Sequence, residues 1–91
     1  MMIMAVVHPS IFQVMRRFPE HREEILHLYH SSELFRTTCY DYKKCKKALL
    51  YWSSLSSDES SARRAEYGEL LHSIETEIIN YLSEGGLPRE A

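Results

Sequence analysis

The sequence predicts an all-α protein, a small helical bundle built around an antiparallel helical hairpin. Outside Met1 to Val7, no stretch alternates apolar and polar residues as a half-buried β-strand does. Gly, the usual turn residue of β proteins, occurs only 3 times among 91 residues. A hydrophobic fraction of 44% and a charged fraction of 26% are typical of one folded domain and not of a disordered chain. We therefore expect a single helical domain over residues 1–91, with flexible ends at residues 1–9 and 85–91.

Two short helices are predicted before the hairpin. Ser10 is a candidate N-cap for the first, which runs from Ile11 to about Arg17. That helix must end before Pro19, because the residue preceding a proline is pushed out of the helical region. Pro19 then opens a second helix that runs to about Tyr29, since proline at the first helical position loses no hydrogen bond. Negative charge in its first turns suits the helix dipole and comes from Glu20, Glu23 and Glu24.

The third helix is predicted from an apolar stripe of about twenty residues. Ser31 or Ser32 is its candidate N-cap. The tract 53–61 follows the stripe, and its serines favour a loop because their side chains compete for backbone hydrogen bonds. The stripe recurs at steps of three or four and consists of Phe35, Cys39, Tyr42, Cys45, Leu49 and Trp52.

The fourth helix completes the hairpin. Its apolar residues recur from Tyr67 to Tyr81, and Gly85, Gly86 and Pro88 supply a C-terminal stop. The two long helices then pack antiparallel through the serine loop, with the first two helices across the hairpin or at its end. The predicted core joins the two stripes and consists of Phe35, Tyr42, Leu49 and Trp52 packed on Leu71, Ile74, Ile78 and Tyr81.

Charge and cysteine usage limit the classes of partner and the compartment. The net charge of -2 provides no general attraction to nucleic acid or to anionic lipid. The apolar segment Met1 to Val7 is about a third of the ~20 residues needed to span a bilayer, so we expect no signal peptide and no transmembrane segment. Cys39 and Cys45 project about 120° apart on one helix, so we expect no disulfide between them. These features predict a cytoplasmic protein with reduced thiols and no membrane partner.

One segment resembles a known family. The residues from Phe18 to about Leu49 resemble the opening of the small YdcH-type bacterial proteins, and the final helix is similar only in its pattern. The resemblance implies a cytoplasmic helical hairpin of unknown function and brings no catalytic residue. The sequence departs from the family in the segment Met1 to Arg17, in the basic run Lys43 to Lys47 and in its two cysteines. The motif residues are Phe18, Pro19, Glu20, Arg22, Ile25, Leu28 and Phe35.

Two pairs have the Glu-x-x-His spacing of di-iron helical bundles, Glu24 with His27 and Glu69 with His72. A di-metal site needs these ligands to point into the bundle. At about 100° per residue, both pairs turn away from the apolar stripes of their helices. We therefore interpret them as surface pairs and expect no metal, no cofactor, no catalytic residue and no enzymatic activity.

The remaining histidines and the cysteines each leave an alternative open. His27 and His30, with Glu23 one turn away, could hold an adventitious zinc ion, but cations at the negative end of a helix explain them better. Cys39 and Cys45 fall on or beside the apolar stripe, which favours a role as small buried hydrophobes. The neighbouring lysines could instead lower the pKa of Cys45 and make it a redox sensor.

One surface stripe is a candidate binding site, because basic and aromatic residues alternate on the third helix opposite the predicted core. We interpret it as an interaction surface for a protein partner, with single-stranded nucleic acid as the alternative. The lysines could also pair with the acidic fourth helix or across a homodimer, which would cover apolar faces that so small a domain leaves open. The stripe consists of Arg36, Tyr40, Lys43, Lys44, Lys47 and Tyr51.

Overall fold

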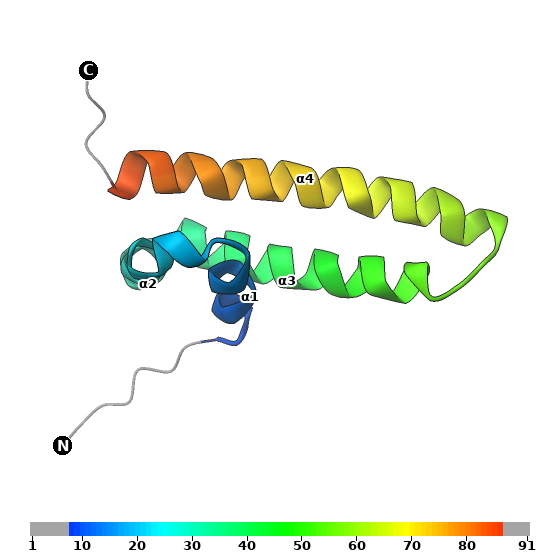
Figure 1. Cartoon of the computed structure of the whole chain (residues 1–91), viewed down its shortest axis with the longest axis horizontal. Helices are drawn as coiled ribbons and strands as arrows, with labels where there is room; N and C mark the ends of the chain where they lie inside the picture. The colour runs from blue at the N-terminus through cyan, green and yellow to red at the C-terminus, as the bar shows by residue number, and fades with distance from the viewer. Residues whose placement is uncertain (1–7, 87–91) are drawn as a thin grey trace.

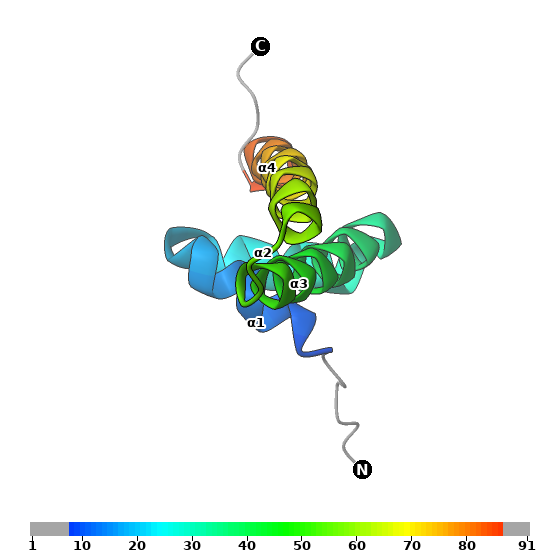
Figure 2. The ribbon, with the colours of Figure 1, turned by 90° about the vertical axis from the view of Figure 1, so that its right-hand side faces the viewer.

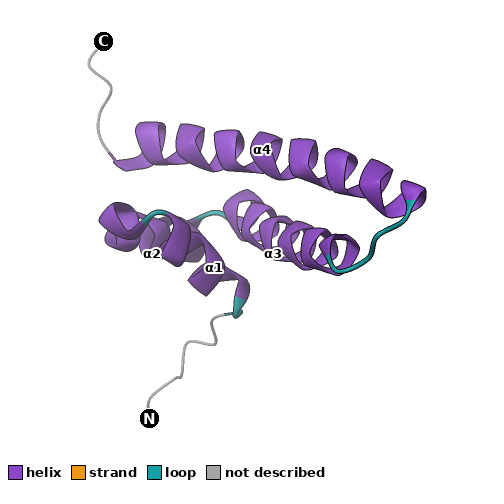
Figure 3. Ribbon diagram, turned by 45° about the vertical axis from the view of Figure 1, so that its right-hand side comes forward, coloured by secondary structure: helices purple, strands orange, loops and turns teal. Residues whose placement is uncertain are grey.

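A computed structural model describes residues 8–86 and confirms the all-α fold, with helices and connecting loops over this range (Figure 3). Met1 to Val7 and Pro88 lie outside the described residues. Of the ends expected to be flexible, Pro9 directly precedes the first helix, and the last helix includes Gly85 and Gly86. The elements are α1 (Ser10–Arg17), the 3-10 turn η1 (Pro19–His21), α2 (Arg22–Ser31), α3 (Glu33–Ser53) and α4 (Asp58–Gly86).

The two long helices α3 and α4 form the predicted antiparallel hairpin (Figure 1). α1 and α2 lie at the end of the hairpin away from the α3–α4 loop, on the same side of α4 as α3 (Figures 1 and 2). We call this end the open end and the opposite end the loop end. None of the helices over residues 8–86 is long and apolar enough to cross a lipid bilayer.

α1 begins at Ser10, one residue earlier than predicted. Pro9 occupies the N-cap position, and Ser10 is the first helical residue. The backbone N–H of Ser10 donates to Nδ1 of His8 at 3.1 Å. Ser10 is buried, and its hydroxyl has no hydrogen-bond partner among the described residues. The predicted cap role of Ser10 is therefore wrong, because the turn at His8 and Pro9 rotates its side chain into the core.

The ends of α3 and α4 depend on serine side chains. Ser32 caps α3, since its hydroxyl accepts from the backbone N–H of Phe35 at 3.0 Å. Ser57 and Ser60 cap α4 reciprocally, each hydroxyl accepting from the other's backbone N–H at 2.8 and 3.1 Å. The predicted serine loop is therefore shorter than residues 53–61, because α4 begins at Asp58 and includes Ser60.

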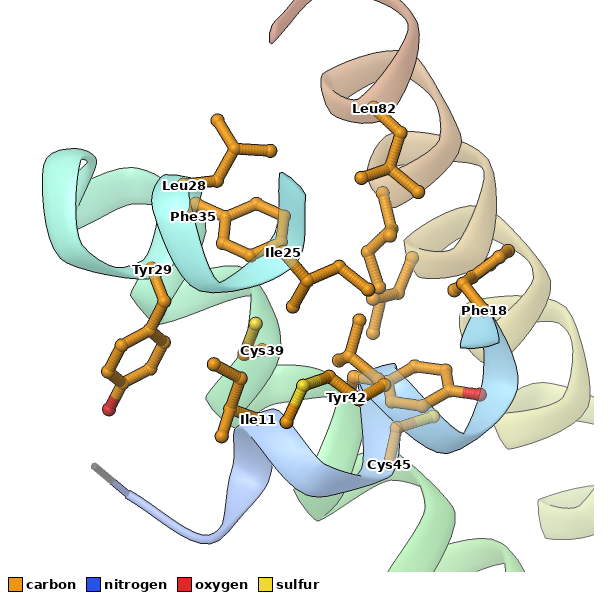
Figure 4. Close-up of a cluster of buried hydrophobic side chains, with 14 residues drawn as sticks. Ile11, Phe18, Ile25, Leu28, Tyr29, Phe35, Cys39, Tyr42, Cys45 and Leu82 are labelled. Atoms are coloured by element: carbon orange, nitrogen blue, oxygen red, sulfur yellow. The ribbon is translucent and has the colours of Figure 1, made fainter. Parts of the chain in front are cut away.

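The core lies at the open end, where all four helices meet (Figure 4). Phe35, Tyr42, Ile74 and Ile78 are buried there, as the two stripes predict. α1 and α2 supply about half of the buried hydrophobic side chains, which the two-stripe prediction left out. Their contribution consists of Ile11, Val14, Met15, Phe18, Ile25, Leu28 and Tyr29.

Two residues predicted for the core do not belong to it. Leu49 and Trp52 are only half-buried, although they continue the α3 stripe. Leu71 and Tyr81 pack against the core from its edge and are also only partly buried. For Leu49 and Trp52 the reason is the position of α1 and α2, which cover the hairpin at the open end and leave its loop end as two helices.

A polar contact ties α1 to the hairpin beside this core. Arg17 of α1 donates from Nε to Glu75 of α4 at 3.1 Å, and the hydroxyl of Tyr42 on α3 donates to the same oxygen at 3.0 Å. Burial alone would raise the pKa of Glu75, but the hydrogen bonds from Arg17 and Tyr42 outweigh it and hold that pKa below its ordinary value. Burial, reinforced by the bond to Glu75, raises the pKa of Tyr42. The three helices are thus joined by one ionised carboxylate at neutral pH.

Candidate partner-binding surface

Most of the predicted basic and aromatic stripe lines one open hollow on α3. The hollow has a volume of about 690 Å³. Tyr40 and Tyr51 are 45% and 59% exposed, so their rings are available at its two ends. We call its lining the α3 surface, which consists of His8, Tyr40, Lys43, Lys44, Lys47, Ala48, Tyr51 and Trp52.

The lysines of the α3 surface keep their charges free of the acidic helix α4. Lys44 lies 4.0 Å from the carboxylate of Asp41 on its own helix, and its ammonium lies 4.7 Å from the ring centroid of Tyr40. Among the described side chains, no ion pair joins Lys43 or Lys47 to a carboxylate. An exposed pair at 4.0 Å contributes ~0 to 1 kcal/mol, so Asp41 does little to neutralise the cluster.

Arg36 does not belong to this hollow. Its guanidinium donates to the backbone carbonyl of Tyr29 at 2.7 Å, at the C-terminal end of α2. It also lies 6.0 Å from the centroid of the Tyr29 ring. Arg36 lines a smaller neighbouring hollow of about 320 Å³ that shares His8 and Tyr40 with the α3 surface. A helix C-terminus attracts cations, so this arginine holds α2 against α3 instead of facing a partner.

The stripe prediction missed three residues of the α3 surface. Ala48 follows Lys44 by four residues and Trp52 follows Ala48 by four, so a wider projection of α3 would have included them. Trp52 was instead assigned to the core. His8 could not be found by periodicity, because it precedes α1 and reaches Tyr40 only in the folded chain, with the ring centroids 5.2 Å apart.

Lys46 does not line the hollow of the α3 surface. Its ammonium lies 5.7 Å from the ring centroid of Tyr42. Its charge contributes to lowering the pKa of Glu75 on α4. Among the described side chains, no ion pair joins a lysine of α3 to a carboxylate of α4, and the one ion pair of Lys44 stays within α3.

The two Glu-x-x-His pairs lie where helical projection places them, away from the core. His27, Glu69 and His72 are exposed, and Glu24 is half-buried. Glu24 pairs with His21 and not with His27. Each pair thus lies on the surface of its own helix. The two pairs are on different helices and do not converge on a common metal site.

The two histidines that could hold an adventitious zinc ion are also at the surface. His27 and His30 are exposed, and the ring of His30 meets the ring of Tyr29 edge-on with centroids 6.0 Å apart. Within residues 8–86, the His, Cys, Asp and Glu side chains form no group of three or more that could hold a metal ion.

Both thiols are buried and unpaired, which confirms their predicted core role. Burial raises the pKa of Cys39 to about 12 and also raises the pKa of Cys45. The Cys45 thiol donates to the backbone carbonyl of Tyr67 on α4 at 3.3 Å. The alternative in which lysines lower the pKa of Cys45 is therefore wrong, because burial of the sulfur outweighs the nearby charges.

No protein-family model, curated protein or solved structure matches the chain. The resemblance to YdcH-type proteins therefore stays a prediction.

Proposed function

We propose that the protein is a cytoplasmic, non-enzymatic interaction module that binds an acidic segment of a partner protein through the α3 surface. The observation that carries the proposal is a cluster of lysines around an aromatic hollow, none of which forms an ion pair with the acidic helix α4 among the described side chains.

The charge of the α3 surface favours an acidic partner. Lys43, Lys44 and Lys47 occupy neighbouring positions on one helix, and like charges at this spacing repel. A carboxylate of a partner would relieve this repulsion. The long lysine stems would also cover apolar parts of the partner.

The aromatic rings of the hollow favour an apolar anchor within that acidic segment. Tyr51 and Trp52 meet edge-on with ring centroids 5.0 Å apart, and Tyr40 lies at the other end of the hollow. Tyr and Trp contribute large contact areas at low entropic cost, and they are enriched among residues that dominate binding energy. A helix or strand that presents one apolar side chain between acidic residues fits this arrangement.

Two further observations support a non-enzymatic role in the cytoplasm. The raised pKa values of Cys39 and Cys45 leave both thiols protonated at neutral pH, so neither is an activated nucleophile. Two unpaired thiols in one small domain are also typical of a reducing compartment.

Single-stranded nucleic acid is the second candidate partner. It is favoured by the exposed Tyr40 and Tyr51 rings beside lysines, since bases stack on such rings and phosphates bind such cations. The two candidates differ in their salt dependence, because release of counterions from phosphates makes nucleic-acid binding fall steeply as salt rises.

The test uses Trp52, the single tryptophan of the chain, as the reporter of binding. We would titrate the protein with a Glu- and Leu-rich helical peptide and, separately, with a single-stranded oligonucleotide. Lys44→Glu together with Lys47→Glu should abolish the response to the peptide while leaving the melting temperature nearly unchanged, since both side chains are exposed. The matched control reverses two other exposed cations, Arg16→Glu with Arg22→Glu, and should bind like the parent.

Each result has a defined meaning. A response to the oligonucleotide alone, lost as salt rises, would replace the protein partner by nucleic acid. A peptide response that survives Lys44→Glu with Lys47→Glu, or that disappears equally in the arginine control, would remove the α3 surface from the function.

A further inference from the structure

A second hollow lies between α3 and α4, on a different flank of α3 from most of the α3 surface. We call it the interhelical groove. It has a volume of about 540 Å³ and contains no residue of α1 or α2. Buried Cys45 and Ile74 form its floor, and Leu70 stands beside them at 48% exposure. Its complete lining is Asp41, Lys44, Cys45, Ala48, Tyr67, Leu70, Ser73, Ile74 and Glu77.

The groove marks the part of the hairpin that lacks a covering helix. At the open end, α1 and α2 pack over the hairpin and bury its apolar stripes. Towards the loop end, Tyr67 and Ala48 are only half-buried, and Leu70 is exposed. Two helices alone cannot enclose an apolar stripe, and stable bundles cover it with further helices.

Charge complementarity indicates what packs over the interhelical groove. α3 has a basic run at Lys43 to Lys47, whereas α4 has exposed carboxylates at Glu66, Glu69 and Glu77. Among the described side chains, Lys44 pairs with Asp41 and Glu66 pairs with Arg63, each within its own helix. Each hairpin thus presents a basic helix beside an acidic helix, which is the charge pattern that a second copy can match.

The register of the hairpin places basic residues of α3 and acidic residues of α4 at similar heights, as this match requires. Contacts of Tyr42 with Glu75, and of Arg64 with the backbone carbonyl of Trp52, fix which residues of α3 and α4 lie at the same height. In this register Lys44 lies about one helical turn from the height of Glu69. A two-fold axis parallel to the hairpin keeps these heights and brings α3 of each copy against α4 of the other.

We propose that a second copy of this chain covers the interhelical groove, forming a four-helix bundle from the two hairpins. In this dimer Leu70 of each copy packs into the other's groove, and Lys44 faces Glu69 of the other copy. Tyr40, Lys43, Lys47 and Tyr51 do not line the groove, so most of the α3 surface stays open for the partner proposed above. The inference goes beyond that function, and the two surfaces share only Lys44 and Ala48.

The first experiment measures the mass of the chain in solution by light scattering and sedimentation over a wide range of concentration. We expect the parent to approach twice its chain mass of 10.7 kDa. Leu70→Glu should raise the dimer dissociation constant ~100-fold, because it places an unpaired charge in the interface. Ile79→Glu is the matched control, since Ile79 is an aliphatic residue of the same helix with 47% exposure that does not line the groove.

The second experiment tests the orientation by exchanging charges, and it stays informative if Leu70→Glu reduces helicity. Glu69→Lys should weaken the dimer, and adding Lys44→Glu to the same chain should restore it. A parent that stays monomeric at millimolar concentration would overturn the proposal. So would an Ile79→Glu variant that dissociates as readily as Leu70→Glu, or a charge exchange that fails to restore the dimer.

Discussion

The open end and the loop end of the hairpin use the same helices and differ in what covers them. At the open end, Phe35 of α3 and Ile78 of α4 are fully buried beneath side chains of α1 and α2. At the loop end, Leu49 and Trp52 continue the same α3 stripe but stay half-buried. The stripe alone therefore does not decide burial, because an apolar face is buried only where a third element packs on it.

This difference separates stability from binding within one molecule. The open end contains nearly all of the fully buried hydrophobic side chains and the Arg17–Glu75–Tyr42 contact. The loop end contains much of the α3 surface and the interhelical groove, where apolar and charged side chains remain available to partners. Substitutions should accordingly affect folding at the open end and association towards the loop end.

The largest expected effect compares core truncations at the two ends. Ile78→Ala at the open end should lower the free energy of unfolding by ~2 to 5 kcal/mol, because it leaves a cavity in a packed core. Leu49→Ala towards the loop end should cost only ~1 kcal/mol, since its side chain is only partly buried. Chemical denaturation of both variants measures the difference. Equal losses would show that the loop end is as well packed as the open end.

A smaller effect concerns the contact that ties α1 to the open end. The lowered pKa of Glu75 means that its ionised form stabilises the folded chain above the ordinary carboxyl pKa of ~4.3. This stabilisation is lost as the pH falls through the lower pKa of the folded state. Glu75→Gln keeps an acceptor for Tyr42 and removes the charge, so it should cost ~1 kcal/mol at pH 7 after allowance for the half-exposed Arg17.

The pH dependence supplies the check on Glu75. The difference in unfolding free energy between the parent and Glu75→Gln should shrink as the pH is lowered from about 5 to about 3. Glu66→Gln, which breaks the exposed pair with Arg63, is the control and should change stability by less than ~0.5 kcal/mol at any pH. A constant difference for Glu75→Gln would mean that its charge does not hold α1.

The smallest expected effect is a substitution of a buried residue that does not lower the melting temperature. Ser10→Ala should leave the melting temperature unchanged or raise it, because the buried hydroxyl has no hydrogen-bond partner among the described residues. Ser32→Ala is the comparison, since Ser32 caps α3 and its loss should cost ~1 kcal/mol. If Ser10→Ala instead costs as much as Ser32→Ala, its hydroxyl has the capping role that the sequence predicts.

Much of the fold was predictable because it depends on local patterns. The spacing from Phe35 to Trp52 and from Tyr67 to Tyr81 predicted both long helices and their antiparallel pairing. Ser32 was one of two candidate caps, and helical projection placed the Glu-x-x-His pairs on the surface. In contrast, the predicted start of α1 was wrong because Pro9 takes the cap position, and the predicted serine loop was too long because several serines of the tract could serve as caps.

The candidate site was predictable only where it follows one helix. Tyr40, Lys43, Lys44, Lys47 and Tyr51 share a face of α3 because helical geometry alone brings residues three and four apart together. Arg36 belongs to the same projected face, but the carbonyl of Tyr29 at the end of α2 draws it away. His8 enters the hollow from before α1, which no pattern within α3 could indicate.

By itself the sequence determined the helices, their stripes and the surface position of the charged pairs, because these follow from backbone periodicity and capping within each segment. Only the tertiary structure decided which stretch of each stripe is buried, since that depends on where α1 and α2 pack. It also decided that Glu75 pairs with Arg17, and that burial raises the pKa of Cys45 despite neighbouring lysines. These outcomes depend on contacts between residues far apart in the chain, and a linear pattern does not record them.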